Sequence, residues 1–278
     1  MIPYFNGHLF DLPHWLPLVG DQPIYMFGLL VAIGVIVGDS IVVKEGARRG
    51  LDPQDVKFLN VRIVFGGFIM AHLVSVFFYF PETLHNLSLK QLVWRLISIW
   101  SGLSSFGGFL GAAIAFLYYT RKEKISALSY ADSVALGLVV GWIFGRTGCF
   151  TAHDHPGRLT NFFLAVRYPG GSRHDLGFYE LLFTIVIAVV LFRYARRPRV
   201  PGRVIGLFAT MYAPVRFSLD FLRATDYARP DERYAGLTPA QWACIACLAT
   251  GVWLLTRKGE VLPPSAAVPA PEPQSAAP

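Results

Sequence analysis

The sequence predicts an all-α, polytopic integral membrane protein with about seven transmembrane helices. Of its 278 residues, 54% are hydrophobic and only 15% are charged, whereas soluble globular chains carry about 25% charged residues. The apolar residues form long unbroken runs, each close to the roughly 20 residues that a membrane-spanning helix needs. This composition argues against a soluble enzyme, a disordered chain and a nucleic-acid-binding domain, so we expect no nucleic-acid partner.

Each predicted span is a run of mostly apolar residues. In order along the chain, the ranges are 24–43, 61–80, 102–120, 126–149, 176–192, 204–222 and 238–256. Helices satisfy their own backbone hydrogen bonds in lipid, and a strand barrel would need short alternating segments instead. Residues 89–100 predict a short amphipathic helix that leads into the third span.

The distribution of basic residues predicts the orientation. Lys and Arg concentrate after the first, third, fifth and seventh predicted spans, and the first 23 residues hold none. Because cytoplasmic loops are enriched in Lys and Arg, we expect the amino terminus outside and the carboxyl terminus in the cytoplasm. The net charge of +7 agrees with this bias and with contact to anionic membrane lipids.

The predicted seven-helix membrane domain covers residues 24–258 and includes a small external cap near 150–175. Residues 1–23 predict an interfacial segment on the outer surface. Residues 259–278 are rich in Pro and Ala and predict a disordered tail. No cleavable signal peptide is apparent, because the basic region that opens one is missing.

Ionisable residues inside the predicted spans are candidates for function, since each costs about 2.5–3.5 kcal/mol on insertion scales. They are Asp39, His72, Asp132, Arg146, Glu180, Arg216 and Asp220. In the sixth span Tyr212, Arg216 and Asp220 recur every four residues and share one helix face, and Arg223 follows on the same stripe. Such a stripe forms either a structural ion pair or an oxyanion site, and the planar guanidinium of Arg suits phosphate.

The fourth predicted span ends near Arg146, and His153, Asp154 and His155 follow it. A His beside an Asp and an Arg is a candidate general base, and a solvated, hydrogen-bonded loop is the alternative. Alternate residues do not share one helix face, and no further ligand has matching spacing. We therefore expect no metal site and no cofactor.

Small residues form a stripe in the third predicted span around Gly107 and Gly108. This stripe favours tight helix packing, or a break that lets backbone amides face a ligand. The three cysteines do not make a disulfide framework. The residues alone thus predict arginines that converge on a polar site for an anionic amphiphile, in a lipid enzyme, a lipid carrier or a transporter.

Several of these stretches, from about residue 23 to 258, resemble the bacterial prolipoprotein diacylglyceryl transferase family. One motif of the family reads roughly G-R-x-G-N-F, followed by x-N-G-E-x-x-G-R. Residues 145–150 match its first part, and Asp154, Gly157 and Arg158 match its second part. The sixth-span pattern of the family matches Gly206, Leu207, Phe208, Tyr212, Arg216, Asp220 and Arg223. A Tyr-Glu pair matches 179–180, and a glycine pair matches 107–108.

The resemblance implies an enzyme of the bacterial inner membrane that acts on phosphatidylglycerol and on preprolipoprotein signal peptides. It implies transfer of diacylglyceryl to the thiol of the lipobox cysteine, the first step of lipoprotein maturation, with release of glycerol-1-phosphate. The implied catalytic residues are Arg146, Arg216, His153 and Asp154. The implied substrate-binding residues are Tyr212, Asp220, Arg223, Gly107, Gly108, Gly157, Arg158, Glu180 and His72. In this scheme Arg146 and Arg216 hold the phosphate, and Asp220 and Tyr212 orient Arg216.

The chain also departs from the family pattern, which makes it a divergent member. The departures are Phe106 for His, Phe27 for Tyr, Cys149 for Asn, and Asp154 and Asp220 for Glu. Phe106 cannot titrate, so the general base is open among His72, His153, His155 and none. The alternatives are an inactive lipid-binding relative, a transferase with a different acceptor, and another lipid-modifying enzyme or transporter.

Overall fold

The computed structural model describes residues 1–13, 15, 23–79, 87–98, 103–226 and 233–261. The described chain divides into two compact units. The first unit holds the described residues of Met1–Val42 and Ala131–Pro263, and the second holds those of Val43–Tyr130. The divisions fall inside helices α1 (Met26–Arg48) and α5 (Ala127–Ala152).

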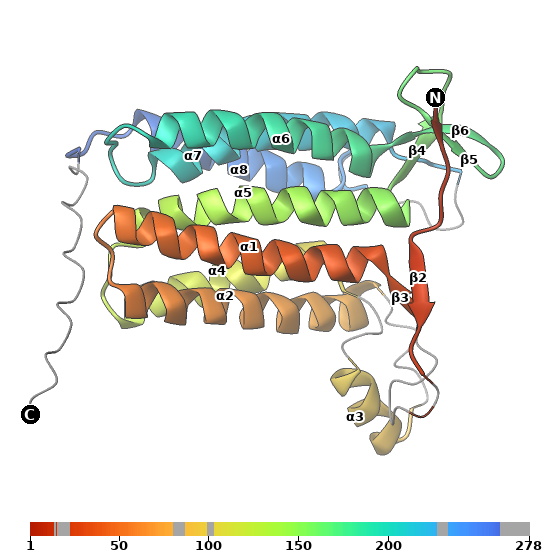
Figure 1. Cartoon of the computed structure of the whole chain (residues 1–278), viewed down its shortest axis with the longest axis horizontal. Coiled ribbons are helices and arrows are strands. Elements are labelled where there is room, and N and C mark those ends of the chain that lie inside the picture. Colours follow the sequence, from red (N-terminus) through yellow and green to blue (C-terminus); the bar gives the residue numbers. More distant parts are fainter. Residues whose placement is uncertain (14, 16–22, 80–86, 99–102, 227–232, 262–278) are drawn as a thin grey trace, which may run out of the picture. The chain divides into compact units, whose positions relative to one another are not determined.

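Helices dominate the first unit. Besides α1 and α5 it contains α6 (Leu176–Ala195), α7 (Arg203–Leu219), the 3₁₀ turn η4 (Asp220–Leu222) and α8 (Pro239–Thr256). Helix α7 lies beside both α6 and α8 (Figure 1). Leu136, Leu191 and Val204, one from each of α5, α6 and α7, are fully buried in one apolar cluster. This cluster is the core that fixes the three helices that carry the candidate site.

Helix α7 begins at a buried carboxylate of another helix. Asp132 of α5 is fully buried, and it accepts backbone N–H bonds from Gly202, Val204 and Ile205, each at 3.0 Å. The first N–H groups of a helix have no partner within the helix and carry partial positive charge. The Asp132 carboxylate satisfies them, which explains how an acid is tolerated inside a predicted span.

Close backbone contact joins α1 to α5. A Cβ placed on Gly137 would lie 2.4 Å from the carbonyl oxygen of Gly38 and 2.3 Å from a methyl group of Val42. No larger residue fits there without moving a helix. Small residues at helix contacts are common in membranes, because association there depends on packing rather than on the hydrophobic effect.

The fold is mostly helical, as the sequence predicts, with short strands in addition at one end of the first unit. A four-stranded sheet has the order β1-β5-β6-β4, in which β1 (Ile2–Pro3) runs parallel to β5 (Val166–Tyr168). Strand β6 (Gly171–Asp175) pairs antiparallel with β5 and with β4 (Pro156–Leu159). Strands β2 (His8–Asp11) and β3 (Pro23–Tyr25) form a separate antiparallel pair.

A β-hairpin in the segment between α5 and α6 satisfies the backbone of that segment locally. Gly170 and Gly171 have φ values of +90° and +134°, which L-residues rarely adopt. They allow the tight connection between β5 and β6. The hairpin leads directly into the first turn of α6 (Figure 1).

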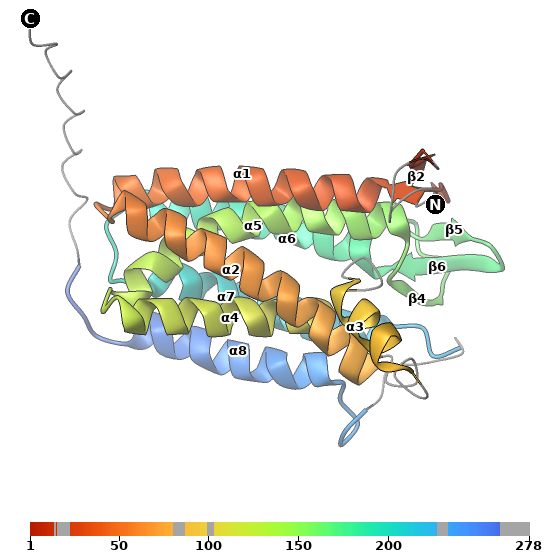
Figure 2. The same ribbon diagram turned by 90° about the horizontal axis from the view of Figure 1, so that it is seen from below.

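The second unit contains α2 (Pro53–Val74), the π-helical turn η1 (Ser75–Tyr79), α3 (Leu89–Ile97) and α4 (Ser105–Lys122). Helices α2 and α4 pack along each other (Figure 2). A Cβ on Gly107 would lie 2.4 Å from the carbonyl oxygen of Met70, and one on Gly111 2.1 Å from that of Gly66. The small-residue stripe of the third predicted span therefore serves tight helix packing.

Helix α3 lies within the range predicted for a short amphipathic helix. Ser88 caps its first turn in a capping box with Gln91, which satisfies backbone donors at the helix start. The exposed apolar residues of α3 are Leu89, Val93, Trp94 and Ile97. Residues 99 and 100 of the predicted range lie outside the described residues.

Among the described residues, six helices are long and apolar enough to cross a membrane. They are Met26–Arg48, Pro53–Phe78, Ala127–Ala152, Leu176–Ala195, Arg203–Leu222 and Pro239–Thr256. These coincide with six of the predicted spans. The predicted span 102–120 forms α4, which is helical but not among the six, because Arg121 and Lys122 lower its mean hydropathy. At about 1.5 Å per residue α4 is about 27 Å long, so a seventh span stays a prediction.

Other sequence predictions fall partly outside the described residues. Residues 14 and 16–22 of the interfacial segment, residues 80 and 102 of two spans, and 262–278 of the tail lie there. The orientation of the termini stays a prediction.

We expect Asp132→Ala to lower the free energy of unfolding by about 3 kcal/mol, because it leaves buried N–H donors of α7 without an acceptor. Asp132→Asn should cost less, since its amide oxygen still accepts. Thermal unfolding of the purified protein in detergent measures both. Asp39→Ala, at an exposed acid of α1, is the control, and an equal loss in that variant would contradict the assignment.

Candidate active site

The candidate site centres on Glu180, a buried carboxylate on α6. Its Oε1 lies 2.7 Å from Nη2 of Arg146 and accepts a bond from Nε1 of Trp142 at 3.3 Å. The hydroxyl of Tyr212 also donates to Oε1. Its Oε2 lies 3.8 Å from Nε of Arg216. Glu180 thereby joins the two arginines that the sequence singled out, one on α5 and one on α7.

A second carboxylate, that of Asp220, also contacts Arg216. Nη1 of Arg216 donates to Oδ1 of Asp220 at 2.6 Å, one helical turn further on. The hydroxyl of Thr238, the N-cap residue of α8, donates to Oδ2 of the same carboxylate. Nη1 of Arg223 lies 3.7 Å from Oδ1. Arg216 and Asp220 of the predicted stripe are thus in contact, and Tyr212 contacts Glu180, while the parts of these residues in substrate binding stay predictions.

Arg146 is buried, and part of its hydrogen-bonding capacity is unused. Its guanidinium lies 4.5 Å from the centroid of the Trp142 ring, a favourable cation–π contact. Its Nη1 makes a long contact of 3.6 Å with Sγ of Cys149. Its Nε is buried and has no hydrogen-bond partner among the described residues. A buried donor without a partner is costly, so this group is suited to receive an acceptor from a ligand.

The charges of this network do not cancel. Three arginines (Arg146, Arg216 and Arg223) face two carboxylates (Glu180 and Asp220), which leaves one positive charge in excess among these five residues, and the nearby Asp154 carboxylate offsets it when ionised. Arginine stays charged even when buried. A phosphodiester, with a single negative charge, would neutralise the network and supply acceptor oxygens.

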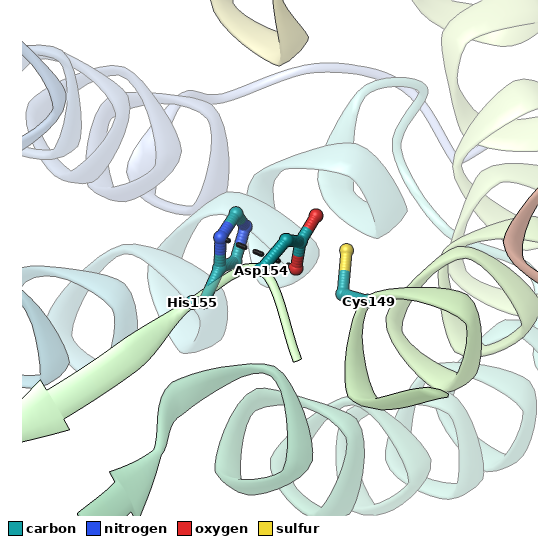
Figure 3. A group of neighbouring side chains, drawn as sticks. All are labelled: Cys149, Asp154 and His155. Atoms are coloured by element: carbon teal, nitrogen blue, oxygen red, sulfur yellow. Dashed lines mark ion pairs between the residues drawn. The ribbon is translucent and has the colours of Figure 1, made fainter. Parts of the chain in front are cut away.

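Three further polar side chains gather where α5 ends. Cys149 lies on the last turns of α5, and Asp154 and His155 follow in the loop before β4. Figure 3 shows the Asp154 carboxylate between the thiol and the imidazole. Desolvation raises the pKa of Asp154 to about 6 although the nearby Arg146 opposes it. Desolvation and the same cation lower the pKa of His155 to about 3, so its imidazole is neutral near pH 7.

His153 does not share these contacts. Its ring stacks on Tyr4 with centroids 4.4 Å apart and meets three more aromatic rings edge-on, those of Phe5, Phe150 and Tyr168. Its Nδ1 lies 2.8 Å from Oδ2 of Asp175. With φ at +50°, His153 turns the chain out of α5 as a left-handed C-terminal residue. These contacts fix the turn that follows α5. A catalytic role for His153 stays a prediction.

Gly157 and Arg158 belong to β4. A Cβ on Gly157 would lie 2.8 Å from the carbonyl oxygen of Leu222 and 2.7 Å from Cβ of His174. Only glycine lets β4 approach the end of α7 this closely, and Gly157 makes a β-bridge with Arg223 there. Arg158 is exposed.

The remaining predicted residues belong to the second unit. His72 is buried, and its Nε2 lies 3.2 Å from the carbonyl oxygen of Arg95. Gly107 packs against the backbone of α2. Gly108 is half-buried beside it on the same helix. Substrate binding by these three residues stays a prediction.

The structure thus brings together Arg146, Glu180, Tyr212, Arg216, Asp220 and Arg223, with Asp154 near Arg146. The sequence reasoning missed Trp142 and Thr238. Trp142 lies one helical turn before Arg146, so helical spacing could have found it. The capping-box pattern that opens α8 identifies Thr238 as an N-cap, but nothing in that pattern points to Asp220.

Fold and sequence together define a multi-pass membrane protein with a buried cluster of arginines and carboxylates. A sequence model of one family, described as Prolipoprotein diacylglyceryl transferase, matches residues 13–257. The chain belongs to that family.

Curated relatives agree over most of their length. The chain is 30% identical over 237 residues to a phosphatidylglycerol–prolipoprotein diacylglyceryl transferase of Chromohalobacter salexigens, covering 84% of this chain and 85% of that protein. A protein of the same name from Nitratidesulfovibrio vulgaris is 30% identical over 246 residues, covering 86% and 91%. One from Polynucleobacter asymbioticus is 34% identical over 212 residues, covering 74% and 77%.

We expect Glu180→Leu to lower the free energy of unfolding by about 3–5 kcal/mol, because it strands the Arg146 guanidinium in a buried place. The double variant Arg146→Met/Glu180→Leu should regain part of this loss, since Arg216 keeps Asp220 as its partner. Thermal unfolding in detergent of the native chain, of Arg146→Met, of Glu180→Leu and of the double variant measures these losses. Val186→Ala, on the exposed face of α6, is the control. Strictly additive losses would contradict a buried ion pair.

Proposed function

We propose that this protein transfers diacylglyceryl from phosphatidylglycerol to the thiol of the lipobox cysteine in preprolipoproteins. Family membership and the names of the curated relatives support the reaction class. The observation that carries the proposal is the buried network of arginines around Glu180, in which Nε of Arg146 has no hydrogen-bond partner in the described part of the chain. Phosphatidylglycerol offers the matching group, a phosphodiester with one negative charge.

In the proposed reaction, Arg146 and Arg216 bind the phosphate of phosphatidylglycerol. The thiolate sulfur of the lipobox cysteine attacks C3 of the diacylglyceryl group, and the bond between C3 and the phosphate oxygen breaks. The electron pair of that bond stays on oxygen, so glycerol-1-phosphate leaves with one more negative charge than the bound diester carried. Donors that are already oriented stabilise such developing charge without reorganising.

Burial strengthens this effect. Arg146 is 5% exposed and Glu180 is 3% exposed, so their fields are screened less than those of surface groups. Glu180 keeps both guanidinium groups in place before the lipid arrives. On the same helix, Leu182, Phe183 and Val186 are exposed, as expected of a surface that contacts acyl chains.

Complementation tests the activity. Bacteria depleted of their own diacylglyceryl transferase should regain growth and lipoprotein lipidation when they express this chain. Arg146→Gln and Arg216→Gln should each reduce transfer by about 100-fold or more, since removing one stabilising donor costs that much in other enzymes.

Arg167→Gln is the matched control, because Arg167 is an exposed arginine of β5. No rescue by the native chain, at good membrane expression, would contradict the proposed reaction. Retained phosphatidylglycerol binding in that case would instead identify a lipid-binding relative.

We further propose a seven-span topology in the bacterial inner membrane, with α4 as the additional span. The amino terminus and the β4–β6 segment would face outward, and the end of α8 would face the cytoplasm. The basic residues after α4, α6 and α8 support this orientation.

Reporter fusions test the topology. A fluorescent protein that folds only in the cytoplasm should be active when joined after Gly259, and a phosphatase active only outside should be active when inserted at Gly170. The exchanged pair of fusions should be silent. Activity of the phosphatase after Gly259 would reverse the proposed orientation.

A further inference from the structure

The cluster at the end of α5 combines three side chains that bind transition metals. Sγ of Cys149, a carboxylate oxygen of Asp154 and a ring nitrogen of His155 all lie within 4.8 Å of one another (Figure 3). The three residues come from one short stretch, in which a helix end supplies the thiol and the following loop supplies the other two. Such a set of sulfur, nitrogen and oxygen ligands is typical of zinc.

The separation between the nitrogen and oxygen ligand atoms suits a tetrahedral ion. Nδ1 of His155 lies 3.4 Å from Oδ1 of Asp154. Two ligand atoms that each lie about 2.0–2.1 Å from a tetrahedral zinc are about 3.4 Å apart. The Cys149 sulfur lies within 4.8 Å of the other two ligand atoms, and zinc binding would draw it closer to them.

A second observation points to a ligand at this place. Nδ1 of His155 is buried and makes no hydrogen bond in the described part of the chain. Buried ring nitrogens normally have a partner. The Asp154 oxygen beside it is too distant for a good hydrogen bond, so an ion between the two atoms would satisfy both.

We propose that Cys149, Asp154 and His155 bind a zinc ion whose fourth position takes the substrate cysteine as a thiolate. This inference rests on the proposed transferase function. In this proposal the ion promotes loss of the thiol proton, a task that the apolar side chain of Phe106 cannot perform. Catalytic zinc sites commonly have three protein ligands and one open position, and a thiol that coordinates zinc loses its proton.

The charges favour such a complex beside Arg146. Zn²⁺ with one thiolate, one carboxylate and one neutral imidazole carries no net charge. Addition of the substrate thiolate makes the complex singly negative. The Arg146 guanidinium, 3.6 Å from the Cys149 sulfur, would compensate that charge before the lipid binds, and one negative charge would be in excess once the phosphodiester is bound as well. The same arginine is proposed to hold the lipid phosphate, so thiolate and electrophile would meet around one residue.

The proposed step balances as follows. The substrate thiol binds zinc and releases its proton to water. The thiolate sulfur forms a bond with C3 of the diacylglyceryl group while the C3–O bond to phosphate breaks and its electron pair goes to the phosphate oxygen. The product is a neutral thioether, a weak ligand that leaves the ion, and no electron donor or acceptor is needed.

Sequence reasoning dismissed a metal site because it considered His153, Asp154 and His155 as the ligands. The fold instead turns His153 toward Asp175 and leaves the other two facing Cys149, which belongs to the preceding helix. The proposal thus replaces our expectation from the sequence.

Metal analysis of the full-length protein, purified in detergent with phosphatidylglycerol, tests the site. After exposure to Zn²⁺ and dialysis, we expect about one zinc per chain. Cys149→Ser and His155→Ala should each lower zinc affinity by more than about 100-fold. Cys247→Ser, at an exposed cysteine of α8, should keep it. No retained zinc, or equal zinc in Cys149→Ser, would overturn the proposal.

Cobalt substitution tests the ligands and the substrate without relying on turnover. The Co²⁺ protein should show a thiolate-to-cobalt absorption band that Cys149→Ser lacks. A lipobox peptide with cysteine should intensify this band, and the same peptide with serine should leave it unchanged. An unchanged band with the cysteine peptide would overturn the substrate-thiolate part.

The two proposals fail in distinguishable ways. Rescue in the complementation assay by a chain that binds no zinc would overturn the metal site and leave the transferase function standing. Absence of rescue by a chain that binds zinc through Cys149 would overturn the transferase function and support the metal site alone.

Discussion

The pairing of Glu180 with two arginines is the interaction on which the rest of the site depends. Arg146 and Glu180 lie in a region closed to water, where an unpaired charge would cost several kcal/mol. Glu180 contacts Arg146 of α5 and Arg216 of α7, so it fixes three helices at one point. In the function that we propose, the same network that holds the helices together also binds the phosphate of an anionic lipid.

Buried carboxylates are used repeatedly to join elements in the first unit. Asp132 satisfies the N-terminal donors of α7. Asp175 accepts from the backbone of α6 and from Tyr168 and His153. Asp220 connects Arg216 to the start of α8 through Thr238. In each case a carboxylate meets a helix N-terminus or a cation, the two partners that make its burial tolerable.

The turn after α5 positions two of the zinc ligands that we propose, Asp154 and His155. His153 adopts a left-handed conformation and its ring is held among aromatic side chains, and this directs Asp154 and His155 back toward Cys149. A rigid turn matters because zinc requires its ligands within a few tenths of an ångström.

The sequence by itself determined the membrane class, six of the helices and the stripe of Tyr212, Arg216 and Asp220, because apolar length and helical spacing are local properties. Only the tertiary structure decided that Glu180 bridges the two arginines and that the His153 side chain contacts Asp175 instead of joining Asp154 and His155. Both contacts join residues that are far apart in the chain. The short strands were also missed, because two- to five-residue strands exist only through their partners and carry no periodicity of their own.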